Sequence, residues 1–420
     1  MVYSHDAFGL GNLRRMLAIC EHLLGNWPGL SILLVSGSPM IHEFRLPSGL
    51  DYIKLLCLNR GAAGQLYAKY LGTSVEETVS LRSHLIHLAA KRFKPDLLLV
   101  DKKPSGLNGE LTATLDYLKN ERPYSKCVLL LRDILDTAKK TVDEWVQWRY
   151  YQTLQTYYDQ ILIVGMQSVF DVVQEYRMPL SIAHKVRYCG YIRKPLSPSH
   201  IDLHSDLHRG LHSDFHRGLH SDLHGGLHAP ERTVLVTPGG GEDGYDMVNN
   251  YLTGLKALGH SLKCPPKFHS LIICGPEMSQ AQQQLLRQLA HQCSNVTLKS
   301  FASDMLTSLM TADVVVSMGG YNTVTEILSL KKPAVVVPRI KPSQEQLIRA
   351  SRFAERGWIT MLHPEKLTGR SLLEAVVNQL ENPLKPPIGI DFSGLPQIAH
   401  NLKNILPIRR QPRSLTSLSA

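Results

Sequence analysis

Two glycine-rich segments in the second half of the chain carry residue types that bind phosphate groups. The first, TVLVTPGGGEDG, places Gly239, Gly240 and Gly241 directly after a run of β-branched and leucine residues. Glycine has no Cβ, so backbone N–H groups in such a loop can approach a phosphate closely. The segment is not a P-loop, because no Gly-Lys-Ser/Thr follows it. On its own, the glycine run fits a plain strand-to-helix turn equally well.

The second segment, VVVSMGGYNTVTE, combines Ser317 with the adjacent glycines Gly319 and Gly320. We predict a strand that ends at Ser317 and a helix that begins near Thr323. Glycines, hydroxyls and a helix N-terminus would then form an anion site at the carboxyl end of a strand. Glu326, one turn into this helix, could accept two hydrogen bonds from a ribose diol. Alternatively, Thr323 and Glu326 form a capping box, which needs no ligand.

Polar residues also follow the next apolar run, and we expect them at the same edge of the predicted sheet. The segment KPSQEQLIRA follows residues 334–337 and contains Ser343, Glu345 and Gln346. Parallel strands bring their carboxyl ends to one edge of a sheet, so these side chains would lie beside the glycines. They could hydrogen-bond sugar hydroxyls, or they could be solvated residues of a first helical turn.

A third loop lies at the start of the chain. SHDAFGLGNLRR places Gly9 and Gly11 after a short apolar run and before a helical pattern. A glycine loop at the end of a strand commonly holds a negative group, so we expect this one to face a phosphate. Only three residues precede the loop, whereas an interior parallel strand usually has about five. We therefore expect either a longer open reading frame or a truncated first strand.

Four titratable residues follow first-domain strands and are candidates for a catalytic base: His5, Asp6, Asp101 and Asp133. Asn12 follows the first loop, and its amide forms hydrogen bonds but cannot take up a proton at neutral pH. A lone histidine after a strand is more often structural, and Asp6 and Asp133 fit loop caps equally well. The residues alone leave the identity of a base open.

Composition and charge define a soluble globular class. Of 420 residues, 43% are hydrophobic and 20% charged, and the formal net charge is +10. A positive balance suits anionic partners such as nucleotides or acidic lipid surfaces. No dense Lys/Arg block with interleaved aromatic residues occurs, which argues against nucleic acid as a partner. The seven widely spaced cysteines lack a C-x-x-C pair, so we expect no disulfide framework, no zinc site and a reducing cytoplasm.

Short apolar runs alternate with amphipathic stretches along most of the chain, which is typical of parallel sheets covered by helices on both faces. The series occurs once before residue 195 and again after residue 230, and it predicts two doubly wound α/β domains, at 1–195 and 231–407, facing across a cleft. The expected strands are Ser31–Val35, Leu97–Val100, Val128–Leu131, Ile161–Val164, Thr233–Val236, Leu271–Cys274, Val314–Ser317 and Ala334–Val337. The expected helices include Met16–Leu24, Val75–Ala90, Gln280–His291 and Thr323–Leu330.

A histidine-rich octapeptide repeat separates the two domains. HSDLHRGL, HSDFHRGL and HSDLHGGL follow one another, and a histidine recurs at every fourth residue from 200 to 228. On a helix this spacing would place the histidines on one face, as in a metal-binding tract. The glycines oppose a rigid helix, so we interpret 196–230 as a disordered linker insertion. Residues 408–420 form a basic tail that we expect to be frayed.

The stretch from 301 to 350 resembles the donor-binding half of MurG-like GT-B glycosyltransferases, which transfer a sugar from a UDP-sugar. SMGGYNTVTEILSLKKPAVVVP is similar to their signature, in which Ser, Gly, Thr, Glu and two prolines recur at fixed spacing. The start of the chain is similar to a predicted glycosyltransferase group of this fold with an HD-x-FGLG-x-LRR start. DKKPSGLNGEL and LRDILD resemble further segments of that group. The resemblance implies the GT-B fold, in which two Rossmann-like domains face across a cleft.

The resemblance also implies a role for each part of the site. Phe301 would cap or stack on the uracil, beside backbone contacts from Ala302. Glu326 would bind the ribose hydroxyls, and Glu345 and Gln346 would touch the donor sugar. The pyrophosphate would be surrounded by Gly239, Gly240, Gly241, Ser317, Gly319, Gly320 and Thr323, and from the first domain by Gly9 and Gly11.

Two positions depart from the resembling proteins. Asn12 stands where the group typically has a histidine, and Arg349 replaces an asparagine common in MurG-like enzymes. A positioned general base typically contributes about 10²–10⁴-fold to a rate, so the first change would be serious if that histidine were the base. Either His5, Asp6 or another acid serves instead, or the protein is catalytically impaired.

The implied activity is an inverting, metal-independent transfer from a UDP-sugar to an unidentified acceptor hydroxyl. No D-x-D run marks a metal site, and no cofactor is expected beyond the donor itself. Many relatives act on lipid-linked acceptors, so we expect a cytoplasmic protein with peripheral contact to the inner face of the membrane. Two alternatives remain: a sugar-nucleotide epimerase of the same fold, and a nucleotide-sugar-binding protein without turnover. An ordinary Rossmann oxidoreductase is disfavoured because Gly9 and Gly11 lack the third glycine of its fingerprint.

Overall fold

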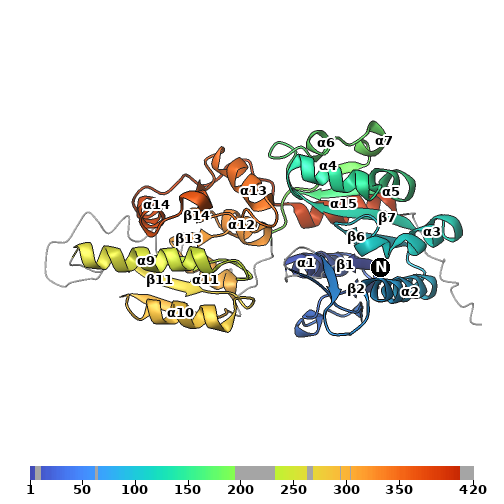
Figure 1. Ribbon diagram of the computed structural model, residues 1–420. Helices are drawn as coiled ribbons and strands as arrows, with labels where there is room; N and C mark the ends of the chain where they lie inside the picture. The colour runs from blue at the N-terminus through green and yellow to red at the C-terminus, as the bar shows by residue number, and fades with distance from the viewer. Residues whose placement is uncertain are drawn as a thin grey trace, which may run out of the picture.

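The computed structural model comprises two α/β domains joined side by side (Figure 1). It describes residues 1–4, 11–61, 65–193, 232–262, 268–293, 295–302 and 304–406. The predicted linker, 196–230, and the predicted basic tail, 408–420, lie outside these residues. No helix in the described part of the chain has both the length and the apolar character needed to cross a membrane.

The N-terminal domain is built on a seven-stranded, fully parallel sheet with the order β3-β2-β1-β6-β7-β8-β9. Its strands are nearly continuous apolar runs, as expected for strands that are buried on both faces. They are β1 (Val2–Ser4), β2 (Ile32–Ser36), β3 (Leu50–Lys54), β6 (Leu97–Asp101), β7 (Lys126–Arg132), β8 (Gln160–Val164) and β9 (Val186–Tyr188).

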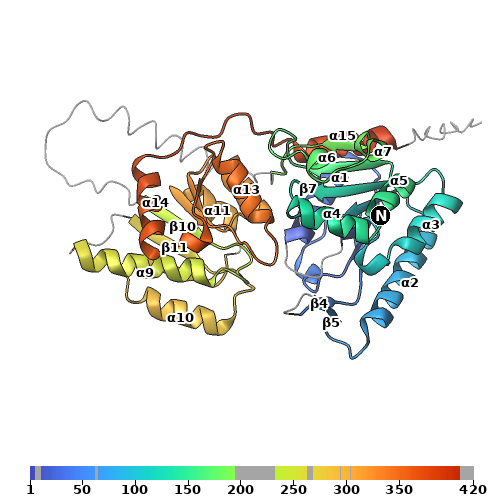
Figure 2. The same ribbon diagram turned by 45° about the horizontal axis from the view of Figure 1, so that its top comes forward.

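Alternate residues of these strands enter two separate hydrophobic clusters. Leu34 and Leu99 pack with Leu13 of α1 on one face, whereas Val35 and Val100 belong to the cluster on the other face. A small antiparallel hairpin, β4 (Leu58–Arg60) with β5 (Leu66–Ala68), stands apart from the main sheet (Figure 2). The helices are α1 (Gly11–Asn26), α2 (Val75–Phe93), α3 (Thr112–Glu121), α4 (Ala138–Gln147), α5 (Tyr150–Tyr157), α6 (Val172–Glu175) and α7 (Leu180–Ala183), with the 3₁₀ turns η1 (Ile41–Glu43) and η2 (Leu107–Gly109).

The C-terminal domain has a six-stranded parallel sheet with the order β12-β11-β10-β13-β14-β15. The strands are β10 (Arg232–Thr237), β11 (Phe268–Ile273), β12 (Val296–Lys299), β13 (Val314–Ser317), β14 (Ala334–Val336) and β15 (Thr360–Met361). The helices are α9 (Tyr245–Leu262), α10 (Gln280–Ala290), α11 (Met305–Thr311), α12 (Tyr321–Ser329), α13 (Glu345–Ala354) and α14 (Gly369–Glu381), with the 3₁₀ turn η3 (Pro364–Lys366).

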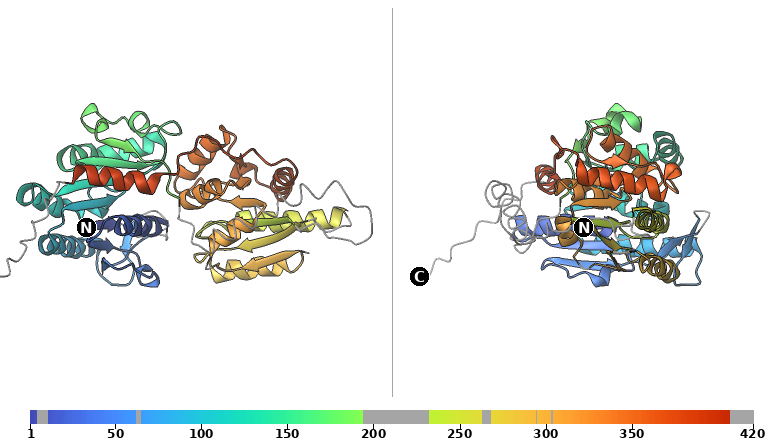
Figure 3. Two further views of the ribbon diagram at one scale, coloured as in Figure 1. Left: turned by 180° about the vertical axis from the view of Figure 1, so that it is seen from behind. Right: turned by 90° about the vertical axis from the view of Figure 1, so that its left-hand side faces the viewer.

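The last helix, α15 (Gly394–Ile405), crosses back to the N-terminal domain and packs against α1 (Figure 3). A short backbone connection ties it to the end of the first domain, where Tyr191 N donates to Asp391 O at 2.7 Å and Gly394 N donates to Tyr191 O at 3.1 Å. The stretch 231–407, predicted as one domain, therefore contributes a helix to the other domain as well.

Strand order in both sheets defines where a ligand is expected. In the first sheet the order reverses between β1 and β6, and in the second it reverses between β10 and β13. Open parallel sheets bind ligands outside the carboxyl ends of the strands at such switch points. The predicted phosphate-binding loops after β10 and β13 lie at the switch point of the second sheet, whereas residues 5–10, which follow β1, lie outside the described residues.

The strands and helices expected from the hydrophobic pattern are confirmed, with ends that differ by a few residues. The α/β class and the parallel sheets of two Rossmann-like domains are confirmed too. The pattern did not indicate β3, β9, β12 or β15, which are outer strands of the two sheets. Outer strands are half-exposed, so their sequences lack the unbroken apolar run by which the central strands are found.

Candidate functional site

Two helix N-termini meet at the junction between the domains. The side chain of Asn322, in the first turn of α12, donates through Nδ2 to the carbonyl oxygen of Gly11, the first residue of α1, at 3.0 Å. Neither helix has an acidic residue in its first turn, and α1 carries Arg14 and Arg15 there. Figure 1 shows α1 and α12 on the sides of the two domains that face each other. Because each helix N-terminus carries a positive partial charge, the junction is suited to an anion.

The glycine loop after β10 lies on the first turn of α12. A Cβ atom at Gly239, where φ is +84°, would stand 3.3 Å from Oγ1 of Thr323. At Gly241, where φ is +100°, a Cβ would come within 2.4 Å of the carbonyl oxygen of Cys274. Both positions therefore require glycine, and the structure brings the two predicted phosphate-binding segments into direct proximity.

The end of β13 leaves a hydroxyl without a partner. Ser317 is fully buried, and its Oγ has no hydrogen-bond partner within the described residues. Buried polar groups without a partner are uncommon in folded proteins, and one at the end of a central strand is a candidate ligand contact. Ser317 directly precedes the turn containing Gly319 and Gly320, at the foot of α12. The unpaired hydroxyl of Ser317 could donate a hydrogen bond to an oxygen atom of a ligand bound there.

The capping-box interpretation of Thr323 and Glu326 is wrong. Gly320 is the N-cap of α12, and no side chain caps this end of the helix. Thr323 is the third residue of the helix and Glu326 lies in the second turn, half-buried. The open N-terminus of α12 therefore keeps backbone N–H groups that no side chain satisfies.

Carboxylates gather on one side of the glycine loop. Glu277 N donates to Gly240 O at 2.8 Å, and the Glu277 carboxylate faces Gly240. Burial raises the pKa of Glu277, and the negative charges of Glu242 and Asp243 add to the effect, whereas Arg14 and Lys69 of the other domain oppose it. This side of the loop disfavours a second anion, and the favourable side is the one toward α12.

Asn12 and Asp101 are both engaged by Arg15. Arg15 Nη2 donates to Asn12 Oδ1 at 3.1 Å and to Asp101 Oδ1 at 2.8 Å, and Arg15 and Asp101 are buried. A carboxylate that neutralises a buried guanidinium is a weak base. The geometry therefore favours a structural role for Asp101 over the predicted catalytic one.

Asp133 joins the two domains. Its carboxylate accepts from Arg349 Nε at 2.8 Å and from Arg349 Nη2 at 2.7 Å, and both side chains are buried. Oδ1 also accepts from Ile134 N at 2.8 Å. Arg349 donates further to Gly319 O at 3.3 Å. Both oxygens of Asp133 are thus occupied, which favours an anchoring role over a role as base.

Glu345 and Gln346 lie at the same junction, but protein groups occupy their polar atoms. Arg132 Nη1 lies 2.9 Å from the buried Glu345 carboxylate. Burial by itself would raise the pKa of Glu345, but the charges of Arg132 and Arg349 outweigh it and hold the pKa below its usual range. Gln346 Oε1 accepts from Arg339 N at 3.1 Å. The amide nitrogen of Gln346 faces Gly320, 3.9 Å from where a Cβ would stand, in the turn predicted to bind phosphate.

Lys102 is a residue that the sequence did not indicate. It follows β6 at the switch point of the first sheet, in a left-handed conformation with φ of +66°. Burial lowers its pKa to about 8; Arg132 and Lys103 act in the same direction, while Glu345 and Asp101 oppose them. The observation that indicates Lys102 is its strained backbone at the end of a central strand, a feature that often marks a functional site. This strain cannot be seen in the sequence.

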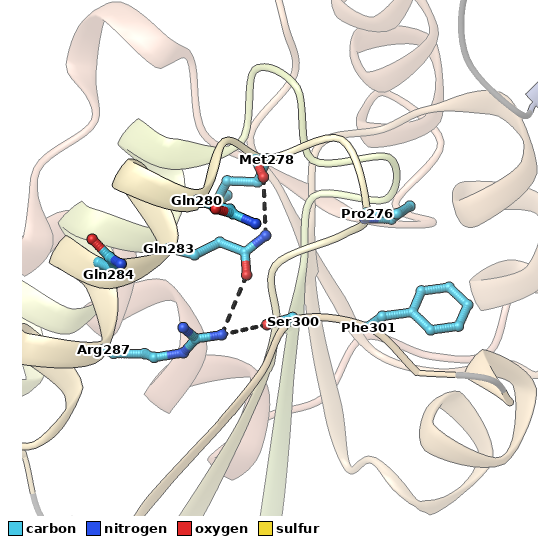
Figure 4. Close-up of a pocket in the computed structure, with 8 residues that line it drawn as sticks. All are labelled: Pro276, Met278, Gln280, Gln283, Gln284, Arg287, Ser300 and Phe301. Atoms are coloured by element: carbon cyan, nitrogen blue, oxygen red, sulfur yellow. Dashed lines mark hydrogen bonds between the residues drawn. The ribbon is translucent and has the colours of Figure 1, made fainter.

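A separate pocket of about 400 Å³ lies in the C-terminal domain beside Phe301. Figure 4 shows polar side chains of α10 on one side and Pro276 and Phe301 on the other. Phe301 is 52% exposed, so its ring is free to cover a planar ligand. Because Pro276 and Met278 flank Glu277, which contacts Gly240, the pocket adjoins the glycine loop.

The structure thus brings most of the predicted nucleotide-binding residues to one junction, with Phe301 at the adjoining pocket. His5, Asp6 and Gly9 lie outside the described residues. No group of three or more His, Cys, Asp or Glu side chains in the described part of the chain is arranged to hold a metal ion. The histidine repeat, predicted either as a linker or as a metal-binding tract, lies outside that part.

Residues 233–388 match the model of the glycosyltransferase family 28 C-terminal domain. A UDP-N-acetylglucosamine–N-acetylmuramyl-(pentapeptide) pyrophosphoryl-undecaprenol N-acetylglucosamine transferase of Desulforamulus reducens is 33% identical over 89 residues, which is 21% of this chain and 24% of that protein. The matched segment therefore spans about a quarter of the length of this curated relative.

Solved structures resemble nearly the whole chain. The MurG structure from Acinetobacter baumannii has a TM-score of 0.56 at 13% identity and covers 96% of this chain and 99% of its own. A UDP-GlcNAc 2-epimerase from Methanocaldococcus jannaschii has a TM-score of 0.56 at 12% identity, with coverage of 96% and 98%. At these identities the likeness shows the fold, which is GT-B.

Breaking the buried Asp133–Arg349 pair from one side should destabilise the protein strongly. Replacing Arg349 by Asn, the residue of the resembling family, leaves a buried carboxylate without its partner. We expect a loss of about 3–5 kcal/mol in the free energy of unfolding, measured by urea denaturation. The double variant Asp133→Asn/Arg349→Asn should lose less than the single one, because no buried charge remains.

Arg352→Asn is the matched control, since it lies on the same helix and pairs with Glu175 at 3.5 Å while both side chains are well exposed. Arg352→Asn should lower the free energy of unfolding by less than about 1 kcal/mol. Equal losses for Arg349→Asn and Arg352→Asn would contradict the anchoring role of the buried pair.

Lys102 should make stability depend on pH. Its pKa is about 8 in the folded protein, against 10.5 ordinarily. Below pH 8, Lys102 is charged in both the folded and the unfolded protein, so folding bears the full free-energy cost of burying this charge. Between pH 8 and 10.5, Lys102 of the folded protein loses its proton, and this cost disappears. Lys102→Met should therefore stabilise the protein by about 1–3 kcal/mol at pH 7, with the gain shrinking as the pH rises.

The measurement is the difference in thermal midpoint between variant and parent from pH 7 to 10. The control is Lys103→Met, which replaces the neighbouring lysine that pairs with Glu144 at 2.9 Å. Its difference in thermal midpoint from the parent should not shrink as the pH rises. A Lys102→Met effect that is constant across the range would refute the assignment.

Proposed function

We propose that this protein is a glycosyltransferase that moves a sugar from a UDP-sugar to an acceptor hydroxyl, with inversion and without a metal ion. The observation that carries the proposal is the meeting of the N-termini of α1 and α12, at 3.0 Å between Asn322 Nδ2 and Gly11 O. Two positive helix ends without acidic residues in their first turns favour a diphosphate between them. The family 28 domain match over residues 233–388 supports the same activity.

The diphosphate lies against the first turn of α12, beside Gly239, Ser317 and the Gly319-Gly320 turn. The carboxylates around Gly240 favour the α12 side of the glycine loop for it, away from Glu277. Thr323 Oγ1 and the orphan Ser317 hydroxyl offer hydrogen bonds to phosphate oxygens. The arrangement uses fixed backbone N–H groups and hydroxyls, which need no reorganisation during the reaction.

The rest of the donor follows from this placement. The nucleobase enters the pocket beside Phe301, and Glu326 binds the ribose hydroxyls. The sugar points toward Gln346 and Glu345 at the junction. Glu345 acts mainly through the guanidinium groups that surround it, because Arg132 holds its carboxylate at 2.9 Å.

In the transfer step the acceptor oxygen attacks the anomeric carbon while the bond from that carbon to the β-phosphate oxygen breaks. The charge that develops on the leaving UDP falls at the two helix N-termini, which stabilise it. The acceptor proton passes to a base. Because Asp101 and Asp133 are held by arginines and Asn12 is not basic, we propose that His5 or Asp6 takes this proton.

The acceptor and the location of the protein belong to the same proposal. The name of the Desulforamulus reducens relative identifies a pyrophosphoryl-undecaprenol acceptor, and we propose a lipid-linked acceptor here. A cytoplasmic protein that touches the inner face of the membrane, with net charge +10, could reach such a substrate.

UDP binding tests the proposal directly. Calorimetry should show saturable UDP binding, and Glu326→Gln should weaken it by about 10- to 100-fold, because a hydrogen bond to a charged group contributes about 1.5–3 kcal/mol. Glu374→Gln, an exposed glutamate of α14, should bind UDP like the parent. A folded protein that does not bind UDP at millimolar concentration would overturn the proposal.

Turnover separates the proposed transferase from its alternatives. With UDP-GlcNAc and a lipid-linked acceptor, the parent should release UDP and form no epimer. If Asn12 limits the rate, Asn12→His should raise UDP release by about 10²–10⁴-fold. Epimer formation without UDP release would identify an epimerase, and saturable binding without UDP release in either protein would identify a binding protein.

A further inference from the structure

The pocket beside Phe301 contains an arginine whose position is fixed by the protein. Arg287, on α10, donates through Nη2 to Ser300 Oγ at 2.5 Å and to Gln283 Oε1 at 3.4 Å (Figure 4). Gln283 is itself oriented, because its Nε2 donates to Met278 O at 2.9 Å. The amide of Gln283 therefore has a defined direction, with its oxygen toward the guanidinium.

This network uses only one nitrogen of the guanidinium. Nε and Nη1 of Arg287 donate to no protein group in the described part of the chain. The residues lining the pocket include no carboxylate that could neutralise the guanidinium. Arginine presents its donors in a planar fork and carries no acceptor. The pocket thus offers the donors of Arg287 on its α10 side, while Phe301 lies on the other side of Ser300 (Figure 4).

We propose that Arg287 selects the nucleobase of the donor, and that it favours bases with an exocyclic carbonyl over bases with an exocyclic amino group. The inference rests on the proposed nucleotide binding in this domain and adds its specificity. The pocket adjoins the glycine loop through Glu277, whose N–H donates to Gly240 O at 2.8 Å. The same glycine loop approaches the first turn of α12 at Thr323, so the pocket and the proposed diphosphate site share this loop.

The selection follows from hydrogen-bond polarity. Uracil and thymine present O4, and guanine presents O6 and N7, all of which accept from a guanidinium. Cytosine and adenine present an amino group at the corresponding position, so donor would face donor and the hydrogen bond to the base would be lost. The stacking surface of Phe301 serves every base equally. Discrimination therefore depends on Arg287 and on the two groups that hold it.

The experiment is a calorimetric comparison of UDP, dTDP, GDP, CDP and ADP with the full-length protein. We expect the parent to bind at least one of UDP, dTDP and GDP about 10- to 100-fold more tightly than CDP and ADP, the range of a base-specific arginine contact. The order among UDP, dTDP and GDP identifies the base. Arg287→Met should remove most of the preference by weakening the favoured nucleotide, with CDP and ADP little changed.

Two further variants distinguish selection from folding. Arg287→Lys keeps the charge but loses the fork, so it should retain phosphate-driven affinity and lose part of the preference. Ser300→Ala should reduce the preference because it frees the guanidinium. Arg370→Met, an exposed arginine of α14 that pairs with Glu374, is the matched control and should behave like the parent.

The outcomes separate this inference from the proposed function. If none of the five nucleotides binds the folded protein, the proposed function fails and the inference with it. If UDP binds and Arg287→Met shows the same order of affinities as the parent, the inference alone is overturned. Parent affinities that are equal for carbonyl and amino bases would overturn it as well.

Discussion

The junction depends on an electrostatic conflict between two helix ends that point at the same space. Each N-terminus carries a positive partial charge of about half an elementary charge, and Arg14 adds to the charge at the start of α1. In the protein alone this repulsion is opposed by the Asn322–Gly11 hydrogen bond. A diphosphate converts the repulsion into attraction to both helices. The geometry that costs stability without a ligand is therefore the one that generates affinity.

Buried charge pairs hold the helix ends at this separation. Asp133 and Arg349 connect the domains from the side of α13, and Tyr321, the first residue of α12, lies under the guanidinium groups of both Arg15 and Arg349 at 5.9 and 5.6 Å. Its hydroxyl also accepts from Ile192 N. A buried ion pair gains little net stability over an apolar contact of the same shape, but it tolerates only one geometry. We infer that these pairs serve to position α12 against α1.

The sequence predicts the elements better than the contacts between them. Unbroken apolar runs such as Val314–Ser317 reveal central strands, and glycines that follow them mark the loops at the switch points. The pairing of Asp133 with Arg349 spans 216 residues, and nothing local indicates it, so Asp133 was predicted as a base. The sequence did not predict a role for Lys102 or Arg287 for the same reason, because their roles depend on neighbours from other helices and strands. Thr323 was wrongly predicted as the N-cap, because the N-cap is Gly320, three residues before the expected helix start.

The two halves of the proposed nucleotide site come from different domains. The pocket beside Phe301 is built entirely from the C-terminal domain, whereas the proposed phosphate site also includes α1 of the other domain. A nucleobase can therefore dock without the junction, but a diphosphate engages both domains at once. In this proposal, the free energy gained by binding the base helps to hold the phosphates between the two helix N-termini. The leaving group develops its negative charge at this same place. Recognition of the base and stabilisation of the leaving group are thus separate in space and joined only through the ligand.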